Sequence, residues 1–252
     1  MLSEYTCEEL AAGLDAVVSE ILAEAGVDRP PVDAFEVARQ LGIAVALDDQ
    51  QAGRARYVRL GGRRSGRMSP TILLRPDVRP ERQQWAVAHE IGEHAAYRVF
   101  DTWGVDPRTT SPGAREDVAN QLAGRLLLPT DWFTADAAGC DWDLAVLKVR
   151  YASASNELIA RRMLECGPAV LVTIFDQGKI YFRRSNLPGR TPGLSPGEGQ
   201  CQRVVHECNC AHRVSEGLCR IQGWPVHEPD WKREILRMEL PEWGVDLGYV
   251  NG

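Results

Sequence analysis

The sequence contains no apolar run of the roughly 20 residues that a membrane-spanning helix needs, and its N-terminus lacks the basic-then-apolar order of a secretory signal. Positive charge is not in excess, because 29 Lys and Arg stand against 35 Asp and Glu, a formal net charge of −6 that on average repels nucleic acid. The odd count of seven cysteines fits reduced thiols better than a disulfide framework. We therefore expect a cytoplasmic globular protein with no membrane partner.

The 252 residues are 44% hydrophobic and 25% charged, an ordinary globular composition. Apolar periodicity predicts mainly helices before residue 167, with short strands between the second and third helix. After Pro168 the pattern changes to a hairpin of two strands, a Pro/Gly/Ser-rich loop at 185–200 and a cysteine-containing tail. The predicted helices cover 7–26, 33–42, 82–100, 115–128, 130 onward, 141–149 and 156–165, and the strands cover 43–47, 54–60, 71–74, 169–175 and 179–183.

One predicted helix concentrates side chains that can bind a metal ion. His89, Glu90, Glu93 and His94 fall within six residues of the stretch Trp85–Tyr97. A helix advances about 100° per residue, so His89 and Glu93 lie about 40° apart on one face. The stretch looks like the zinc-protease signature H-E-x-x-H, except that the second histidine comes one residue late.

Three interpretations of this stretch remain open. In the first, His89 and Glu93 are metal ligands and Glu90 is the general base. In the second, a π-bulge in the helix brings His94 to the metal. In the third, Glu90 and His94 form an i,i+4 pair that supports the site without touching the metal. We favour the first, because an unbroken helix needs no special geometry.

A third protein ligand is expected, since catalytic zinc usually has three ligands and one open position. The best candidate is Glu116 in the first turn of the next predicted helix, with Asp117 as the alternative. The segment before this helix is long enough to let it fold back against the helix of His89.

Four segments in order along residues 30–167 resemble the ImmA/IrrE family of metallopeptidases. They are Pro31-Val-Asp…Ala38…Leu41-Gly-Ile, Trp85…Ala88-His-Glu-Ile-Gly, Glu116-x-x-Ala119-Asn…Ala123…Leu127-Leu-Pro129 and Ser155-x-Glu157-Leu…Arg162-Met-x-x-x-Gly167. The sequence departs from the family pattern at Glu93, where the family usually has its second histidine.

The pattern along the chain predicts an α+β fold, with a mostly helical domain and a small β-sheet over 1–167 and a smaller α+β module over 168–252. The resemblance implies that the first is a zincin-like metallopeptidase domain. The tail, which the family motifs do not cover, would then be a regulatory or sensor module. The resemblance also implies a gluzincin-like Zn²⁺ site, with Glu90 as base and with Glu116 and the helix residues His89, Glu93 and His94 as candidate ligands. Two carboxylates with one histidine would also suit Mn²⁺.

The implied function is an intracellular endopeptidase that cleaves a regulatory protein, often a helix-turn-helix transcriptional repressor, in stress, phage or mobile-element control. Two alternatives are kept. One is a metal-binding sensor or interaction module without turnover, which Glu93 would fit. The other is a nucleic-acid-binding regulator acting through an arginine-rich hairpin at 54–67, a segment that can equally be a solvated sheet edge.

The tail holds a second group of residues that bind metals in other proteins. Its spacing lacks the paired C-x₂-C knuckles of structural zinc sites, so we interpret the cysteines as buried or unpaired thiols. The residues concerned are Cys201, His206, Cys208, Cys210, His212 and Cys219.

Overall fold

The computed structural model describes residues 6–61, 68–106, 108 and 110–241. The chain divides into two compact units. The N-terminal unit comprises Met1–Phe133 with Arg150–Ser155, and the C-terminal unit comprises Thr134–Val149 with Asn156–Gly252. The two units are defined by which residues contact one another. The predicted boundary at residue 167 between two functional domains therefore stays a prediction.

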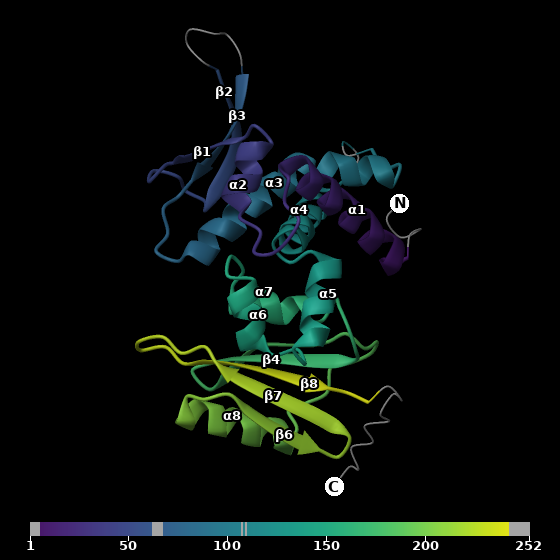
Figure 1. Cartoon of the computed structure of the whole chain (residues 1–252), viewed down its shortest axis with the longest axis vertical. Helices are drawn as coiled ribbons and strands as arrows, with labels where there is room; N and C mark the ends of the chain where they lie inside the picture. Colours follow the sequence, from purple (N-terminus) through teal and green to yellow (C-terminus); the bar gives the residue numbers. More distant parts are fainter. Residues whose placement is uncertain (1–5, 62–67, 107, 109, 242–252) are drawn as a thin grey trace. The chain divides into compact units, whose positions relative to one another are not determined.

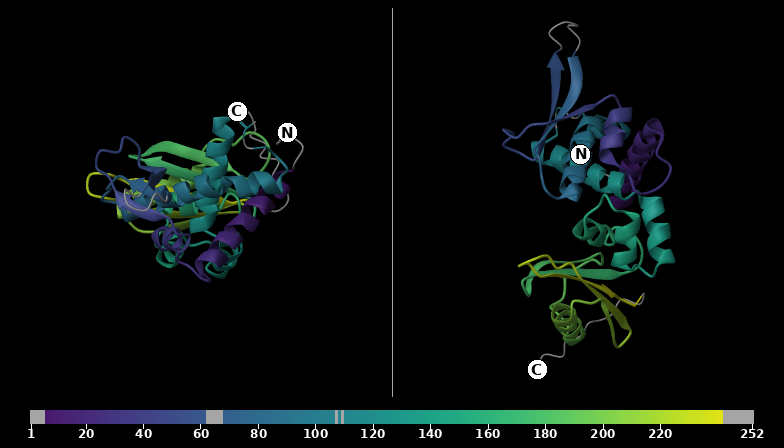
Figure 2. Two further views of the ribbon diagram at one scale, coloured as in Figure 1. Left: turned by 90° about the horizontal axis from the view of Figure 1, so that it is seen from above. Right: turned by 60° about the vertical axis from the view of Figure 1, so that its left-hand side comes forward.

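The N-terminal unit combines helices with one small sheet (Figures 1 and 2). Helices α3 and α4 pack against each other, and α1 and α2 pack on them. The sequence predicted all four of these helices. Their bounds are α1 Cys7–Ala25, α2 Ala34–Gln40, α3 Pro80–Thr102 and α4 Pro112–Leu127.

Local capping signals explain where α1 begins and ends. Thr6 and Glu9 form a capping box, in which each side chain accepts a hydrogen bond from the other residue's backbone N–H. Gly26 ends the helix with φ 68°, a conformation that glycine adopts without strain. Both ends lie within one residue of the predicted range 7–26.

The small sheet has the order β1-β3-β2, with β1 parallel and β2 antiparallel to β3. The strands are β1 Ala44–Leu47, β2 Ala55–Gly61 and β3 Met68–Leu74. Strand β2 is therefore an edge strand, and α3 packs against it. The turn of the predicted arginine hairpin, with Arg63, Arg64 and Arg67, lies outside the described residues.

The C-terminal unit is built on a five-stranded antiparallel sheet of order β5-β4-β8-β7-β6. Figure 1 shows α8 on one face of this sheet and α6 and α7 on the other. The elements from α5 onward are α5 Thr130–Gly139, α6 Leu144–Arg150, α7 Asn156–Arg162, β4 Val170–Asp176, β5 Lys179–Ser185, α8 Pro196–Cys208, β6 His212–Glu216, β7 Cys219–Pro225 and β8 Arg233–Glu239.

Two local predictions in this unit are wrong. The loop predicted over 185–200 ends at Ser195, whose side chain and Glu198 form a capping box that starts α8 at Pro196. The helix predicted over 141–149 begins only at Leu144, because Asp141 has a left-handed backbone with φ 52°. Asp143 caps the helix instead, and its Oδ1 accepts from the N–H of Ala145 at 2.9 Å.

Two further sequence expectations can be compared with the structure. Across the described residues, no helix has both the length and the apolar content to cross a membrane. The tail cysteines are free thiols, with Cys201 and Cys219 buried and Cys208 and Cys210 exposed, as interpreted from their spacing.

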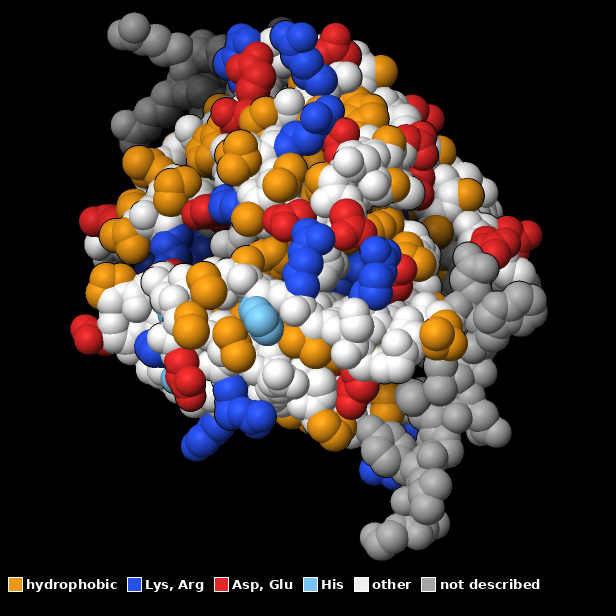
Figure 3. Space-filling model, turned by 60° about the horizontal axis from the view of Figure 1, so that its bottom comes forward, with side chains coloured by type: hydrophobic (Ala, Val, Ile, Leu, Met, Phe, Trp, Pro, Cys, Tyr) orange, Lys and Arg blue, Asp and Glu red, His pale blue; other side chains and the backbone are white. Residues whose placement is uncertain are grey.

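On the face shown in Figure 3, Lys and Arg side chains lie among Asp and Glu side chains.

Candidate metal centre

Helix α3 presents its polar motif on one side and its apolar residues to the core. Ala88, Ile91 and Val99 are fully buried, as the helical period predicts. His89 is half-buried and Glu93 is exposed. The helix is α-helical from Pro80 to Thr102, so its backbone shows no bulge at the motif.

Helix α4 brings Glu116 and Asn120 next to His89. The Nε2 atom of His89 lies 3.6 Å from Oε1 of Glu116. The other ring nitrogen, Nδ1, lies 3.1 Å from Oδ1 of Asn120, whose Nδ2 donates to Glu116 Oε1 at 3.4 Å. A proton on Nδ1, held by the Asn120 carbonyl, leaves Nε2 unprotonated and able to bind a metal.

Three of the four predicted metal ligands come together. His89, Glu93 and Glu116 each offer one ligand atom, and these atoms lie within 4.8 Å of one another. One nitrogen and two carboxylate oxygens at this spacing suit Zn²⁺ or Mn²⁺. The donor set and its spacing therefore fit a divalent metal ion.

Glu90 lies beside this group and is hydrogen-bonded to strand β2. It is 8% exposed, and its Oε2 accepts a hydrogen bond from the backbone N–H of Tyr57 in β2 at 2.6 Å. Burial raises the pKa of the Glu90 carboxyl, and the Tyr57 hydrogen bond partly offsets that rise. A buried carboxylate with a raised pKa and a fixed orientation is suited to accept a proton.

His94 is not in the group of three. Its ring stacks on the ring of Tyr57, with centroids 5.0 Å apart and an angle of 27° between the planes. Burial lowers the pKa of His94, and the charges of Arg98 and Arg59 lower it further. Glu90 and His94 thus each contact Tyr57, one through the backbone and the other through the ring.

A pocket of about 230 Å³ opens beside these side chains. Its lining includes Arg54, Ala55, Trp85, His89, Glu90 and Glu116. The carboxylate of the candidate base and two candidate ligands therefore face a space that a substrate can enter.

The approach of α3 to α4 depends on Gly92. A Cβ atom on this residue would lie 2.6 Å from the backbone carbonyl oxygen of Ala119, closer than van der Waals contact allows. Glu116 and Asn120 flank Ala119 on α4. The absence of a side chain at Gly92 therefore sets the distance between the two helices that share the site.

Replacing Gly92 with alanine should destabilise the N-terminal unit by about 1–3 kcal/mol and weaken metal binding, because α4 must move away from α3. Hydrogen exchange of α3 and α4 and a zinc titration would measure both effects. The matched control is Gly113→Ala in the first turn of α4, where the nearest atom to the new Cβ is 3.9 Å away. That variant should be stabilised by roughly 0.5–1 kcal/mol, and equal effects at the two positions would contradict the packing argument.

Two groups that hold the side chains of this site, the Asn120 amide and the Tyr57 N–H, were not assigned from the sequence. Asn120 could have been found, because it is four residues after Glu116 and shares its face of α4. The N–H of Tyr57 could not, since a backbone donor is present in almost every residue type and leaves no signal in the sequence.

The comparisons with known proteins identify the family of the chain. The sequence model of the peptidase M78 family, the IrrE N-terminal-like domain, matches residues 34–164. The chain therefore belongs to this family, as the resemblance predicted. The matched segment includes both α3 and α4. Membership of the family suggests peptidase activity.

One solved structure shows that the fold extends beyond the family domain. A Mycobacterium tuberculosis transcriptional regulator is similar over 89% of this chain and 74% of its own, with 18% identity and a TM-score of 0.60. At that identity the likeness concerns the fold. No curated protein matches the chain.

Proposed function

We propose that the chain is a metal-dependent endopeptidase in which His89, Glu93 and Glu116 hold Zn²⁺ and Glu90 is the general base. The observation that carries the proposal is the convergence of three ligand atoms within 4.8 Å, beside a buried carboxylate, in a chain of the peptidase M78 family. Three protein ligands leave one position open for water, as in catalytic zinc sites. Mn²⁺ is the alternative metal, because two of the three ligands are carboxylates.

Each residue has a distinct task in the proposed reaction. When bound, the metal lowers the pKa of a coordinated water and polarises the carbonyl of the substrate. Asn120 orients the His89 ring through Nδ1. Glu90, held at one oxygen by the Tyr57 N–H, accepts the proton of the attacking water and can return it to the leaving amine.

The edge of β2 that is not paired with β3 offers a place for an extended peptide. The N–H of Tyr57 faces away from β3, because it donates to Glu90. Alternation along the strand turns the backbone groups of Ala55 and Arg59 the same way, and Ala55 also lines the pocket. A substrate strand that pairs with this edge would run past Glu90.

The proposed substrate is a regulatory protein, a helix-turn-helix transcriptional repressor in the first instance. Support comes from the family and from the solved structure of similar fold, which is itself named a transcriptional regulator. We further propose that residues 168–252 act as the regulatory module. The alternative is a metal-binding sensor without turnover, which the exposed Glu93 in place of the usual histidine favours.

A comparison of ligand variants tests the metal site. His89→Ala and Glu93→Ala should each bind one zinc equivalent less tightly than the wild type by more than about 100-fold and lose cleavage of a repressor encoded beside this protein. His94→Ala should keep both, because that ring stacks on Tyr57. Bound zinc by mass spectrometry and cleavage on gels are the readouts.

Two outcomes would overturn parts of the proposal. Zinc retained in Glu93→Ala and lost in His94→Ala would replace Glu93 by His94 as ligand. A zinc-loaded wild type that cleaves no neighbouring repressor and no unfolded protein would favour the sensor alternative.

A further inference from the structure

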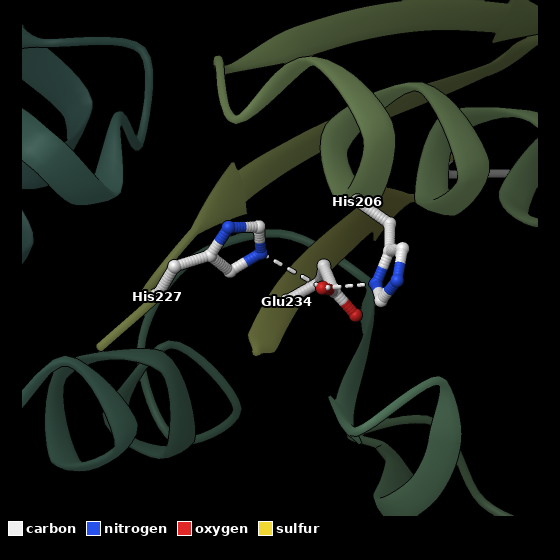
Figure 4. Close-up of side chains that lie close together, drawn as sticks. All are labelled: His206, His227 and Glu234. Atoms are coloured by element: carbon white, nitrogen blue, oxygen red, sulfur yellow. Dashed lines mark hydrogen bonds and ion pairs between the residues drawn. The ribbon is translucent and has the colours of Figure 1, made fainter. Parts of the chain in front are cut away.

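A second group of metal-binding side chains lies in the C-terminal unit, away from the motif of α3. It consists of His206 on the last turn of α8, His227 in the β7–β8 connection and Glu234 on β8. Figure 4 shows the two imidazole rings pointing at the carboxylate of Glu234. Their ligand atoms lie within 4.8 Å of one another.

Both rings approach the same oxygen. Oε1 of Glu234 lies 2.8 Å from Nδ1 of His206 and 2.9 Å from Nε2 of His227. The other oxygen, Oε2, accepts a hydrogen bond from Nε2 of Gln202 at 3.2 Å. The amide thus fixes the carboxylate, as outer partners of metal ligands do, and leaves one oxygen facing two nitrogens.

The buried carboxylate of Glu234 needs hydrogen-bond donors or a cation nearby. Its side chain is 0% exposed, and an isolated buried carboxylate is strongly unfavourable. The adjacent cations are engaged with other groups: Arg233 pairs with Asp176 and Glu157, and Lys232 donates to the backbone oxygen of His206. The carboxylate is therefore left to the two imidazoles and the Gln202 amide, and a cation bound between the rings would balance its charge.

The three side chains come from backbone that is already fixed. Asn209 ends α8 three residues after His206, with a left-handed φ of 51°. Around His227, the N–H groups of Val226 and Glu228 donate across the hairpin to Arg233 and Trp231. Glu234 lies in β8, which is paired on both sides. A site that is preorganised in this way needs little rearrangement to bind an ion.

We infer that His206, His227 and Glu234 form a second binding site for a divalent transition metal, Zn²⁺ in the first instance. Two histidines and one glutamate are an established ligand set for zinc. Tetrahedral ligands at about 2.0–2.2 Å from zinc lie about 3.3 Å apart. The two nitrogen–oxygen spacings of 2.8 and 2.9 Å are shorter than this by about half an ångström. His206 is 33% exposed, which gives an ion and its remaining water access from solvent.

This site differs in chemistry from the candidate centre on α3. It has two nitrogens and one oxygen, whereas His89, Glu93 and Glu116 give one nitrogen and two oxygens. The nitrogen-rich set should prefer Zn²⁺ over Mn²⁺ more strongly. Because the ion would join α8, the β7–β8 connection and β8, its binding would stabilise the C-terminal unit. The inference does not rest on peptidase activity.

The cysteines of the tail do not share this site. Cys201 is buried in the core between α8 and the sheet, and among the described residues the metal-binding groups contain no cysteine. The sequence pointed to His206 as part of a cysteine cluster, but the fold places it with His227 and Glu234. We therefore expect a metal site with nitrogen and oxygen ligands and no thiolate ligand.

The experiment uses the full-length chain carrying His89→Ala, which weakens the first site. Equilibrium dialysis against Zn²⁺ should find one bound equivalent, and adding His227→Ala or Glu234→Gln should raise its Kd by at least about 100-fold. The matched control is His212→Ala, a half-buried histidine on β6 outside the group, which should leave the equivalent in place. Circular dichroism of each variant shows whether it is folded.

Co²⁺ gives a second readout that does not depend on stoichiometry. The bound ion should show visible d–d bands without a thiolate charge-transfer band, and the bands should vanish in His227→Ala. A thiolate band would assign the ion to Cys208 or Cys210 and overturn the ligand set. Equal zinc binding with and without His227→Ala would overturn the site itself. If His89→Ala alone removed all bound zinc, and His227→Ala in the otherwise wild-type chain removed none, this second site would be disproved. The proposed peptidase would not be affected by that result.

Discussion

Replacing Glu90 with glutamine should leave the zinc content unchanged and lower cleavage by about 10²–10⁴-fold. The glutamine carbonyl can still accept the Tyr57 N–H, so the fold and the orientation of the side chain are kept. What is lost is a group that can take a proton from water. Glu90 is not one of the three converging ligand atoms, which is why metal binding should survive.

Glu93→Gln is the matched comparison for Glu90→Gln, because it makes the same chemical change three residues later on the same helix. It should lose metal affinity and cleavage together. Zinc content and kcat/KM for one repressor substrate, measured on both variants, separate the two roles. If Glu90→Gln cleaved within tenfold of the wild type, another residue would be the base.

Replacing Glu198 with alanine should destabilise the C-terminal unit by about 3–5 kcal/mol. The carboxylate is 1% exposed and receives two parallel hydrogen bonds from Arg183, of 2.6 and 2.9 Å. The side chain of Arg183 is 10% exposed, so removing its partner leaves a buried cation. Glu198 also accepts from the N–H of Ser195 at 3.0 Å, which caps α8.

The capping box of α1 provides the control for this variant. Glu9 has the same position relative to Thr6 as Glu198 has relative to Ser195, but it is exposed. Glu9→Ala should therefore lose only its share of the capping box, a much smaller effect than that of Glu198→Ala. Urea unfolding monitored by hydrogen exchange measures the free energy of unfolding of each of the two units separately. Similar losses in the two variants would show that the ion pair adds nothing.

The parts of the fold that the sequence predicted are those with local signals. α1 is bounded by Thr6 and Gly26, and the core side of α3 follows from the spacing of its apolar residues. The convergence of His89, Glu93 and Glu116 was also predictable, because helical geometry places the first two on one face and a helical hairpin brings the third.

The parts that were missed depend on contacts between distant segments. Tyr57 reaches Glu90 across 33 residues and uses a backbone atom. His227 and Glu234 meet only because β7 and β8 pair, and the sequence did not reveal that hairpin. The start of α8 was hidden because Pro196 and Gly197 are typical of loops, although proline is also favoured in the first turn of a helix.

The hydrogen bond from β2 to Glu90 has a consequence for how this site tolerates variation. Because the donor belongs to the main chain, nearly any side chain at position 57 preserves it, and the residue that removes it is proline. The ring of Tyr57 is free to vary with its stacking partner His94. The orientation of the Glu90 carboxylate therefore depends on the backbone of β2, and most side-chain substitutions in that strand should leave it unchanged.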